Sequence, residues 1–404
     1  MRYYDKITPD GTRDLLFDEY TRRQELTGRL TAQFASRGYR QVRTPALEFY
    51  DVFGSAAAHF SQESMYKLSD TQGRLMVLRP DCTIPIARLA ATRLTGMPLP
   101  LRLYYCQHVY RVQHNLRGRA SEIYQTGVEL IGAGNQRSDL EILELAAAAL
   151  GQIGSGFRIE LCHIGYFKAL MDSLEADGVT KEAIRQYIEQ KNYAALTDLL
   201  EQFGDSRPAR ALKYLPRLFG GEEVFRQAYA LFDGCAAQES LDDLRILYGY
   251  LCQLGLREQV LIDLGMVNQA EYYTGILFRG YFDGIGEPVL SGGRYDHLLE
   301  DFGHPLPAIG FGIYVDAAVS LLPERPPQGP QALLFSEEDC LPQAAQQLRE
   351  LVSQGVQVEN SLAATKEEAL QDAQKRQIPR LVYVTAQGVQ QISLSPAAEG
   401  GRQG

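Results

Sequence analysis

The hydrophobic positions in the first part of the chain predict alternating helices and strands. Apolar residues recur with helical spacing over 16–37 and stop at Gly38, a residue that readily closes a helix. Other stretches alternate between apolar and polar residues, as strands do. The elements predicted from these two patterns are a helix over 16–37, strands near Val42 and over 75–78, a helix over 83–94, strands over 101–112 and 120–131 joined as a hairpin by 113–119, and a helix introduced by a capping box of Ser138 and Glu141.

The middle of the chain has an almost wholly helical pattern, and strand patterns return after it. The predicted elements are helices over 181–190, 194–203, 222–232 and 241–254, followed by strands over 260–264, 272–282 and 309–313. We therefore expect an α+β domain over residues 1–322, with one mainly antiparallel sheet flanked by helices and a helical insertion over about 166–256.

A stiff Pro-rich linker over residues 323–330 is expected to separate this domain from a small α/β unit over 331–394. That unit has no clear late strand and no closing helix in its pattern, and we expect the tail, 395–404, to be disordered. The predicted elements of the α/β unit are a strand over 332–335, a helix over 341–352, a strand near Val356, a helix over 366–376 and a strand over 380–384.

Composition narrows the function classes. The formal net charge of -10 argues against nucleic-acid binding as the main function, because proteins that bind nucleic acid usually present a basic face. The one local basic cluster in the sequence is 111–119. The six cysteines are scattered without a CxxC pair, and the six histidines lack metal-ligand spacing, so we expect reduced thiols and no metal. We find neither a secretory signal nor a membrane-spanning run, so a cytoplasmic protein with no membrane partner is expected.

One predicted strand carries an unusual polar face. Gln125 and Glu129 point to the same side with Gly127 between them, and a glycine there lets a ligand approach the backbone. The carboxylate and the amide suit an ammonium group or an imidazole. A solvated edge strand would give the same pattern, but Gln107 and Arg111 repeat the spacing on the partner strand, which favours a polar pocket.

A second group of candidate residues lies in 271–275 and 291–296. Adjacent tyrosines on a strand face opposite ways, so we expect one of Tyr272 and Tyr273 in the core and the other offering its hydroxyl to a ligand. The double glycine of 291–296 permits a close backbone approach, although this segment could equally be a turn that enters a helix over 294–299.

The order and combination of the motifs resemble the histidyl-tRNA synthetases of class II. The resemblance covers about residues 5–322, including the insertion, and implies a class II aminoacyl-tRNA synthetase-like sheet. The motifs that carry it are Thr44-Pro45, Leu78-Arg79-Pro80-Asp81-Cys82-Thr83, Tyr110-Arg111, Gln125-Thr126-Gly127-Val128-Glu129, Glu271-Tyr272-Tyr273-Thr274-Gly275, Gly292-Gly293-Arg294-Tyr295-Asp296 and Pro307-Ala308-Ile309-Gly310-Phe311-Gly312.

The resemblance implies an intact histidine pocket. Asp81 and Gln125 would take the α-ammonium, while Glu129 and a tyrosine hydroxyl would hold the imidazole nitrogens. Arg111 could hold a phosphate, the histidine carboxylate or only a carboxylate of the protein. The implied histidine-binding set is Asp81, Thr83, Arg111, Gln125, Glu129, Tyr272 and Tyr273.

The adenylation machinery of the synthetases is degenerate by the same comparison. Asn268 and Ala317 stand where the synthetases carry arginines for the phosphates, and Gln113 stands where they carry a glutamate. Loss of one preorganised donor typically costs ~10²–10³ in rate, so efficient adenylation is not expected. The C-terminal unit is also shorter than an anticodon-binding domain, which weakens a tRNA role.

A retained histidine pocket without adenylation resembles the family of regulatory subunits of ATP phosphoribosyltransferase. That resemblance implies a non-catalytic protein, without cofactor, that binds L-histidine. It would form a homodimer within a hetero-oligomer, activate a short-form catalytic subunit and transmit feedback inhibition in the first step of histidine biosynthesis. The alternatives are a divergent histidyl-tRNA synthetase, a paralogue that adenylates histidine for another acceptor, or a histidine sensor with a different partner.

Overall fold

The computed structural model describes residues 4–54, 62–113, 120–267, 272–324 and 329–394. The chain forms two compact units, Met1–Pro323 and Glu324–Gly404, and each is considered separately below. The tail predicted to be disordered lies outside the described residues. Among the described helices, none is both long enough and apolar enough to cross a membrane.

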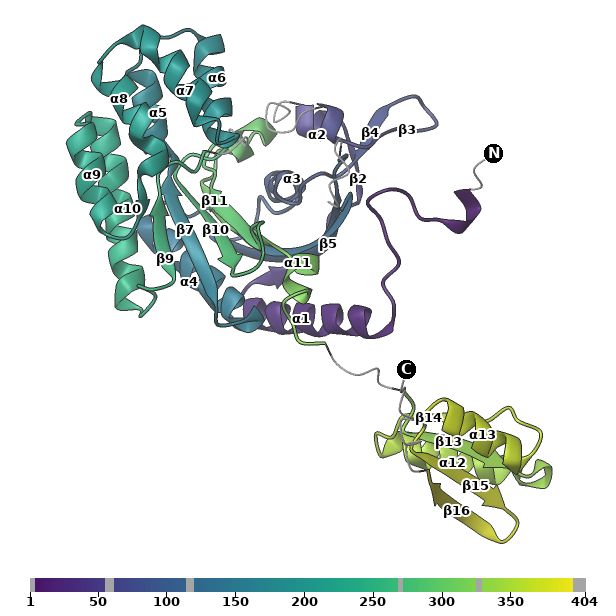
Figure 1. Ribbon diagram of the computed structural model, residues 1–404. Coiled ribbons are helices and arrows are strands. Elements are labelled where there is room, and N and C mark those ends of the chain that lie inside the picture. Colours follow the sequence, from purple (N-terminus) through teal and green to yellow (C-terminus); the bar gives the residue numbers. More distant parts are fainter. Residues whose placement is uncertain (1–3, 55–61, 114–119, 268–271, 325–328, 395–404) are drawn as a thin grey trace. The chain divides into compact units, whose positions relative to one another are not determined.

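The first unit is built on a nine-stranded sheet in which most neighbours run antiparallel, as expected (Figure 1). The parallel pairs are β1 with β5 and β7 with β9. The strands in sheet order are β1 (Arg40–Gln41), β5 (Leu101–Tyr110), β6 (Glu122–Ile131), β12 (Ala308–Tyr314), β11 (Leu290–Arg294), β10 (Ile276–Phe282), β7 (Phe157–His163), β9 (Val260–Asp263) and β8 (Phe219–Gly220).

Helices α1 (Phe17–Ser36) and α4 (Gln136–Ile153) pack on one face of this sheet. Leu26, Leu30 and Phe34 of α1 are fully buried in one core with Val128 of β6. Burying an apolar side chain of this size contributes about 1.5–3 kcal/mol, so this stripe fixes α1 against the sheet. The predicted helix over 16–37 is confirmed.

Helix α3 (Thr83–Arg93) lies on the opposite face of the sheet (Figure 1). Along β5 every second residue is buried, and Leu101, Leu103 and Tyr105 share a second core with Ile86 of α3. The other elements on or near this face are a small sheet of β2 (Leu47–Phe49), β4 (Leu75–Leu78) and β3 (Lys67–Ser69), helix α2 (Asp51–Gly54), and the short helices η3 (Gln62–Ser64) and η6 (Leu298–Phe302).

The capping box predicted at Ser138 is wrong. Helix α4 begins three residues earlier because the Asn135 side chain accepts hydrogen bonds from the backbone amides of Arg137 and Ser138. Ser138 lies inside the first turn and donates to Asn135 O over 2.6 Å. Glu141 binds Arg102 instead, with both carboxylate oxygens at 2.8 Å.

The helical insertion contains all four predicted segments and two helices, α5 and α8, that the pattern did not reveal. Strand β8 pairs with β9, so the insertion also contributes an edge strand to the main sheet. Its elements are α5 (Ile164–Asp172), α6 (Gly178–Glu189), α7 (Tyr193–Leu200), η4 (Glu201–Phe203), α8 (Arg207–Tyr214), η5 (Leu215–Arg217), β8, α9 (Glu223–Leu231) and α10 (Cys235–Gln253).

The segment before β10 differs from the expectation. A strand was predicted over 272–282, but β10 begins at Ile276 and the double tyrosine lies outside it. Gly292 and Gly293 lie within β11, so they are not a turn. The helix expected over 294–299 is the short helix η6, which begins at Leu298.

The second unit has a four-stranded sheet in the order β14-β13-β15-β16 with α12 and α13 in contact with different buried clusters. Strand β16 corrects the expectation that this unit lacks a late strand: it pairs with β15 over six residues. The elements are β13 (Ala332–Ser336), η7 (Glu338–Cys340), α12 (Leu341–Ser353), β14 (Val358–Asn360), α13 (Lys366–Lys375), β15 (Arg380–Thr385) and β16 (Gly388–Ser393).

Candidate functional site

A cavity of about 110 Å³ lies over β6, β11 and β12 on the α3 face of the main sheet. All seven residues predicted from the sequence line it, although they come from positions almost 200 residues apart. The lining residues are Asp81, Thr83, Tyr105, Arg111, Gln125, Glu129, Tyr272, Tyr273, Ser291, Gly292, Tyr295, Gly310, Phe311, Gly312 and Tyr314.

Glycines form the floor of the cavity because a side chain there would displace the polar residues. A Cβ atom at Gly310 would lie 1.9 Å from Glu129 Oε2 and 2.3 Å from the carbonyl oxygen of Val128. At Gly312 it would lie 2.4 Å from the Gln125 amide nitrogen. The register explains this closeness, since Gly310 pairs with Glu129 across β12 and β6. The two polar side chains of β6 can therefore lie flat over the neighbouring strand.

Glu129 is buried at the centre of the cavity and holds two hydrogen-bond donors. Thr83 Oγ1 donates to its Oε1 over 2.8 Å, and the Tyr295 hydroxyl donates to its Oε2. These bonds favour the carboxylate, but burial outweighs them and raises the pKa of Glu129 to about 8. A cationic or N–H-donating ligand would offset this burial.

Asp81 and Arg111 form the charged end of the cavity. Asp81 Oδ1 accepts the backbone N–H of Ile84 over 2.9 Å in the first turn of α3. Burial raises the pKa of Asp81, and the nearby Arg111 guanidinium opposes that rise. Arg111 donates from Nε to the carbonyl oxygen of Pro80 over 2.9 Å and is hydrogen bonded to the Tyr314 hydroxyl. Arg111 is therefore held in place by the protein itself.

Gln125 supplies a buried acceptor without a partner. The residue is 5% exposed, and its Oε1 makes no hydrogen bond within the described part of the chain. An unsatisfied buried polar group costs about 1–3 kcal/mol, so such groups in native proteins call for an explanation. A ligand N–H in the cavity would provide the missing donor.

Both tyrosines of the 272–275 segment face the cavity, so the expectation of one core and one ligand tyrosine is wrong. Their ring centroids lie 4.5 Å apart, and the two hydroxyl oxygens lie 3.5 Å apart. The alternation rule failed because this segment precedes β10 and is not extended strand. Burial raises the pKa of each hydroxyl, so both remain protonated donors at neutral pH.

Sequence reasoning did not single out three tyrosines that line the cavity: Tyr105, Tyr295 and Tyr314. Tyr105 lies on the same face of β5 as Gln107, so strand alternation could have indicated it. Tyr314 shares the cavity face of β12 with Gly312 and Gly310, which lie two and four residues before it. Tyr295 belongs to the 292–296 motif, but the resemblance assigned it no role in binding.

Gln107 does not line the cavity, contrary to the expectation of a polar pocket on both strands. Its amide oxygen accepts the backbone N–H of Thr44 over 2.8 Å, and its amide nitrogen lies 3.2 Å from Thr44 Oγ1. Arg79 donates to the carbonyl oxygens of Thr44 and Pro45 over 2.8 Å each. Gln107 and Arg79 therefore fix the Thr44–Pro45 segment.

Of the three degenerate adenylation positions, the structure describes Gln113 and Ala317, and neither adds a charge to the cavity. Gln113 donates to the carbonyl oxygen of Ala120 over 3.5 Å, beyond the end of β5. Ala317 lies on α11 (Val315–Val319) and packs against the main core. Asn268 lies outside the described residues.

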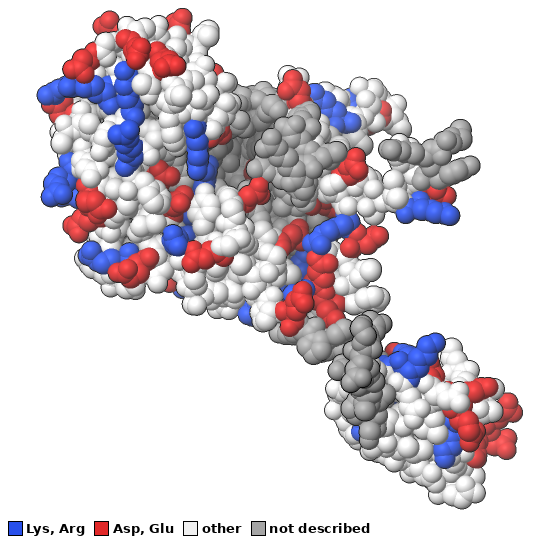
Figure 2. Space-filling model, viewed as in Figure 1, with Lys and Arg blue, Asp and Glu red and all other residues white. Residues whose placement is uncertain are grey.

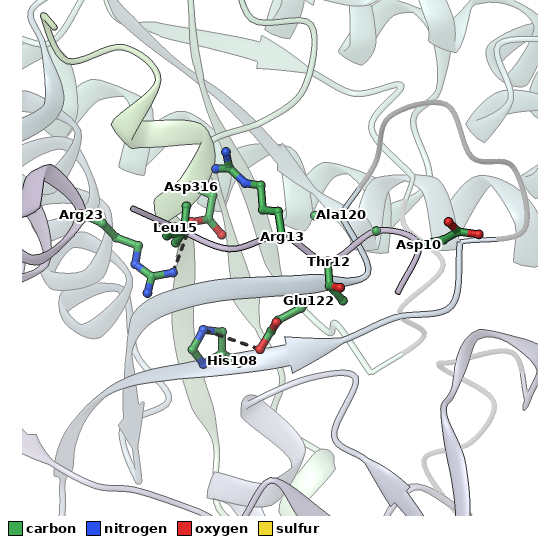
Figure 3. Close-up of a pocket in the computed structure, with 10 residues that line it drawn as sticks. Asp10, Thr12, Arg13, Leu15, Arg23, His108, Ala120, Glu122 and Asp316 are labelled. Carbon is green, nitrogen blue, oxygen red and sulfur yellow. Dashed lines mark ion pairs between the residues drawn. The ribbon is translucent and has the colours of Figure 1, made fainter. Parts of the chain in front are cut away.

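A larger hollow of about 620 Å³ lies on the other face of the β5–β6 hairpin (Figure 3). Two pairs of ionisable groups cross it: Arg23 lies 3.7 Å from Asp316, and His108 lies 3.9 Å from Glu122. Burial lowers the pKa of His108, so this second pair is not charged on both sides at neutral pH. Asp316 also accepts the backbone N–H of Tyr124 over 3.1 Å.

All six cysteines are free thiols. Within the described ranges, no group of three or more His, Cys, Asp or Glu residues could hold a metal ion.

Comparison with known proteins agrees with the fold. The family described as histidyl-tRNA synthetase matches residues 11–318 of the chain. A crystal structure from Bacillus halodurans, described as an ATP phosphoribosyltransferase regulatory subunit/histidyl-tRNA synthetase, is 32% identical with a TM-score of 0.84 and covers 95% of this chain and 100% of that chain. The fold is thus that of the class II histidyl-tRNA synthetase group.

Two clostridial relatives narrow this assignment. An ATP phosphoribosyltransferase regulatory subunit of Clostridium acetobutylicum is 38% identical over 371 residues, which are 90% of this chain and 91% of that protein. One of the same name from Clostridium kluyveri is 42% identical over 326 residues, which are 80% and 83% of the two chains. The chain belongs to the family of ATP phosphoribosyltransferase regulatory subunits.

Proposed function

We propose that this protein binds free L-histidine in the cavity and regulates a short-form ATP phosphoribosyltransferase catalytic subunit without catalysing a reaction itself. The observation that carries the proposal is Gln125 Oε1, a buried acceptor that has no partner among the described residues, together with a carboxyl group whose pKa is raised to about 8. Both features favour a ligand that brings N–H donors and positive charge.

The charges of the lining match a histidine molecule. Asp81 and Glu129 supply two acids, and Arg111 is the one basic residue among the described lining residues. An ammonium group and an imidazole would meet the acids and Gln125, while the α-carboxylate would meet Arg111. A cavity of about 110 Å³ is below the ~300–1,000 Å³ typical of sites for drug-sized ligands, so it favours an amino acid over an adenylate.

The partner assignment rests on the family. The relatives' name specifies a regulatory subunit, and such a subunit requires a catalytic one. Feedback inhibition by histidine follows if the complex has two states that bind histidine with different affinity, because a ligand with equal affinity for both shifts nothing. We expect no tRNA partner, since the net charge is -10 and acidic and basic side chains alternate over the helical insertion in Figure 2.

We also propose a symmetric homodimer through the Thr44-Pro45 region, which continues into strand β2. Strand β2 exposes its apolar side chains and buries its charged one. Leu47 and Phe49 are exposed, whereas Glu48 is buried and accepts a hydrogen bond from Arg88 over 2.7 Å. Leu68 and Leu75 of the same small sheet are also more than 40% exposed. An apolar outer face of this kind is best covered by a second copy in a two-fold dimer. A monomer in light scattering at micromolar concentration would contradict this.

Calorimetric titration with L-histidine in the absence of nucleotide tests the proposed ligand. We expect one site per chain. A folded protein that shows no heat at millimolar histidine would overturn the proposal. Histidine-dependent exchange of pyrophosphate into ATP should stay at background, and robust exchange would instead support the histidine-adenylating alternative.

A further inference from the structure

Tyr314 is the last residue of β12, where the sheet meets the charged end of the cavity. In the sheet register it lies opposite Gln125, and its backbone N–H donates to the carbonyl oxygen of Val289 over 2.8 Å. Its hydroxyl is hydrogen bonded to Arg111. The side chain therefore extends from the strand end to the guanidinium and forms the wall of the cavity there.

We infer that Tyr314 makes the cavity selective for an amino acid whose carboxylate is free, by closing the space beyond Arg111. The inference rests on the proposed function, because the ligand must lie with its carboxylate toward Arg111. No other described lining residue is a cation, so Arg111 is the group that this carboxylate would meet. A substituent on the carboxyl group would then point at the ring of Tyr314.

The size of the cavity supports this reading. Its volume of about 110 Å³ leaves little space beyond one amino acid. Arg111 cannot withdraw easily to make room, because its Nε is bonded to the carbonyl oxygen of Pro80 over 2.9 Å. Arg111 and Tyr314, which line this end of the cavity, therefore hold each other in place.

Tyr314 is also anchored from behind the sheet. Asp316, two residues on, accepts the backbone N–H of Tyr124 over 3.1 Å and faces Arg23 at 3.7 Å across the larger hollow (Figure 3). The guanidinium of Arg23 also lies over the Tyr124 ring at 4.7 Å. These contacts fix the junction of β12 and α11 to β6, so Tyr314 cannot move away without breaking them.

The consequence is a test with two ligands. L-Histidine has a free carboxylate, whereas L-histidylglycine carries the same ammonium and imidazole but extends the carboxyl group by an amide. We expect wild-type protein to bind L-histidine roughly 100-fold more tightly than the dipeptide, because the dipeptide would have to displace Tyr314 and lose the contact with Arg111. Calorimetry measures both affinities.

Two substitutions separate the bulk of the side chain from its hydroxyl. Tyr314→Ala removes the wall and should reduce the discrimination between the ligands by about tenfold or more. Tyr314→Phe keeps the wall and should retain the discrimination, while histidine itself binds several-fold more weakly because Arg111 loses a bond. Tyr250→Ala is the matched control, since Tyr250 is an exposed residue of α10 outside the cavity.

Each outcome decides one claim. Equal binding of the two ligands by wild type overturns this inference but leaves the proposed function intact, and this comparison needs no variant to fold. Undiminished discrimination in a folded Tyr314→Ala protein also overturns it. If wild type binds neither ligand, the proposed function fails and the inference fails with it.

Discussion

The Thr83 hydroxyl donates a hydrogen bond to Glu129 Oε1 over 2.8 Å, from the first turn of α3 to the last part of β6. This contact joins two motifs that lie 46 residues apart in the chain. With Tyr295 bound to the other oxygen, the carboxyl group is oriented before any ligand arrives. Such preorganisation reduces the ordering that binding would otherwise require.

Replacing Glu129 by Gln should weaken histidine binding. With its pKa raised to about 8, the unliganded carboxyl is mostly protonated at neutral pH, and a cationic N–H of the ligand would favour its ionised form. Gln keeps the shape but cannot ionise, and a hydrogen bond to a charged group contributes about 1.5–3 kcal/mol. Calorimetric titration of both proteins measures the change. Glu144→Gln is the matched control, because Glu144 lies on α4 and pairs with Arg37 at the surface. Equal affinities for wild type and Glu129→Gln would remove Glu129 from the site.

The stability of the unliganded protein should depend on pH through Glu129. Its pKa is raised from 4.5 to about 8 in the folded protein, so folding favours the protonated form. The stabilising contribution is fully present below pH 4.5 and is lost as the pH rises toward and through 8. Glu129→Gln cannot ionise, so its free energy of unfolding relative to wild type should increase over this window and then level off. Urea unfolding at several pH values measures this, and a constant difference would mean that the pKa is not raised.

Gly310→Ala should damage both the sheet and the cavity. The added Cβ would lie 2.3 Å from the backbone oxygen of Val128 and 1.9 Å from Glu129 Oε2, and the backbone cannot yield easily. Overpacking of this kind typically costs about 1–3 kcal/mol of stability. Gly249→Ala is the control: it lies in α10 with nothing within 4 Å and should stabilise by about 0.5–1 kcal/mol. Urea unfolding compares the two, and a Gly310→Ala protein as stable as wild type would refute the close packing.

Arg294→Met should lower the free energy of unfolding, although Arg294 itself does not line the cavity. The guanidinium is buried and donates to Asp139 over 2.8 Å, to Ser138 over 2.7 Å and to Asp296 over 2.9 Å. Removing one partner of a buried ion pair typically costs about 3–5 kcal/mol.

Arg245→Met is the surface control for Arg294. Arg245 is 59% exposed and pairs with Asp242 at 3.5 Å, so its loss should cost only about 0–1 kcal/mol. Similar unfolding free energies for the two variants would contradict the structural role of Arg294.

Strand alternation predicted Gln125 and Glu129 because both side chains lie on regular β structure, whereas Asp81 and Thr83 were expected only from the family resemblance. Gln125 and Glu129 lie on one face of β6 and both line the cavity. Alternation predicts the face on which a side chain lies but not which distant residues it contacts. Gln107 was therefore assigned to the pocket, although its amide oxygen accepts a hydrogen bond from the backbone N–H of Thr44. The rule also failed at Tyr272 and Tyr273, which precede the strand.

The start of α4 and strand β16 were missed because contacts outside the local pattern determine them. Ser138 had the spacing of a capping box, but Asn135 lies close enough to accept two amide hydrogen bonds and begins the helix earlier. Strand β16 is exposed along most of its length, so its sequence lacks the apolar signal of a buried strand, and pairing with β15 determines its conformation. Tertiary contacts of this kind are not encoded in a short window of sequence.

The central claim is that histidine in this cavity controls a catalytic partner. The most direct measurement is phosphoribosyl-ATP formation by the short-form catalytic subunit alone, with this protein, and with the Glu129→Gln variant, each over a range of L-histidine. We predict that the wild-type protein forms a complex, raises turnover and makes it sensitive to histidine with a coupling of about 1–3 kcal/mol, whereas the variant raises turnover but responds only at higher histidine. An identical histidine response from wild type and variant, or the absence of any complex, would contradict the account.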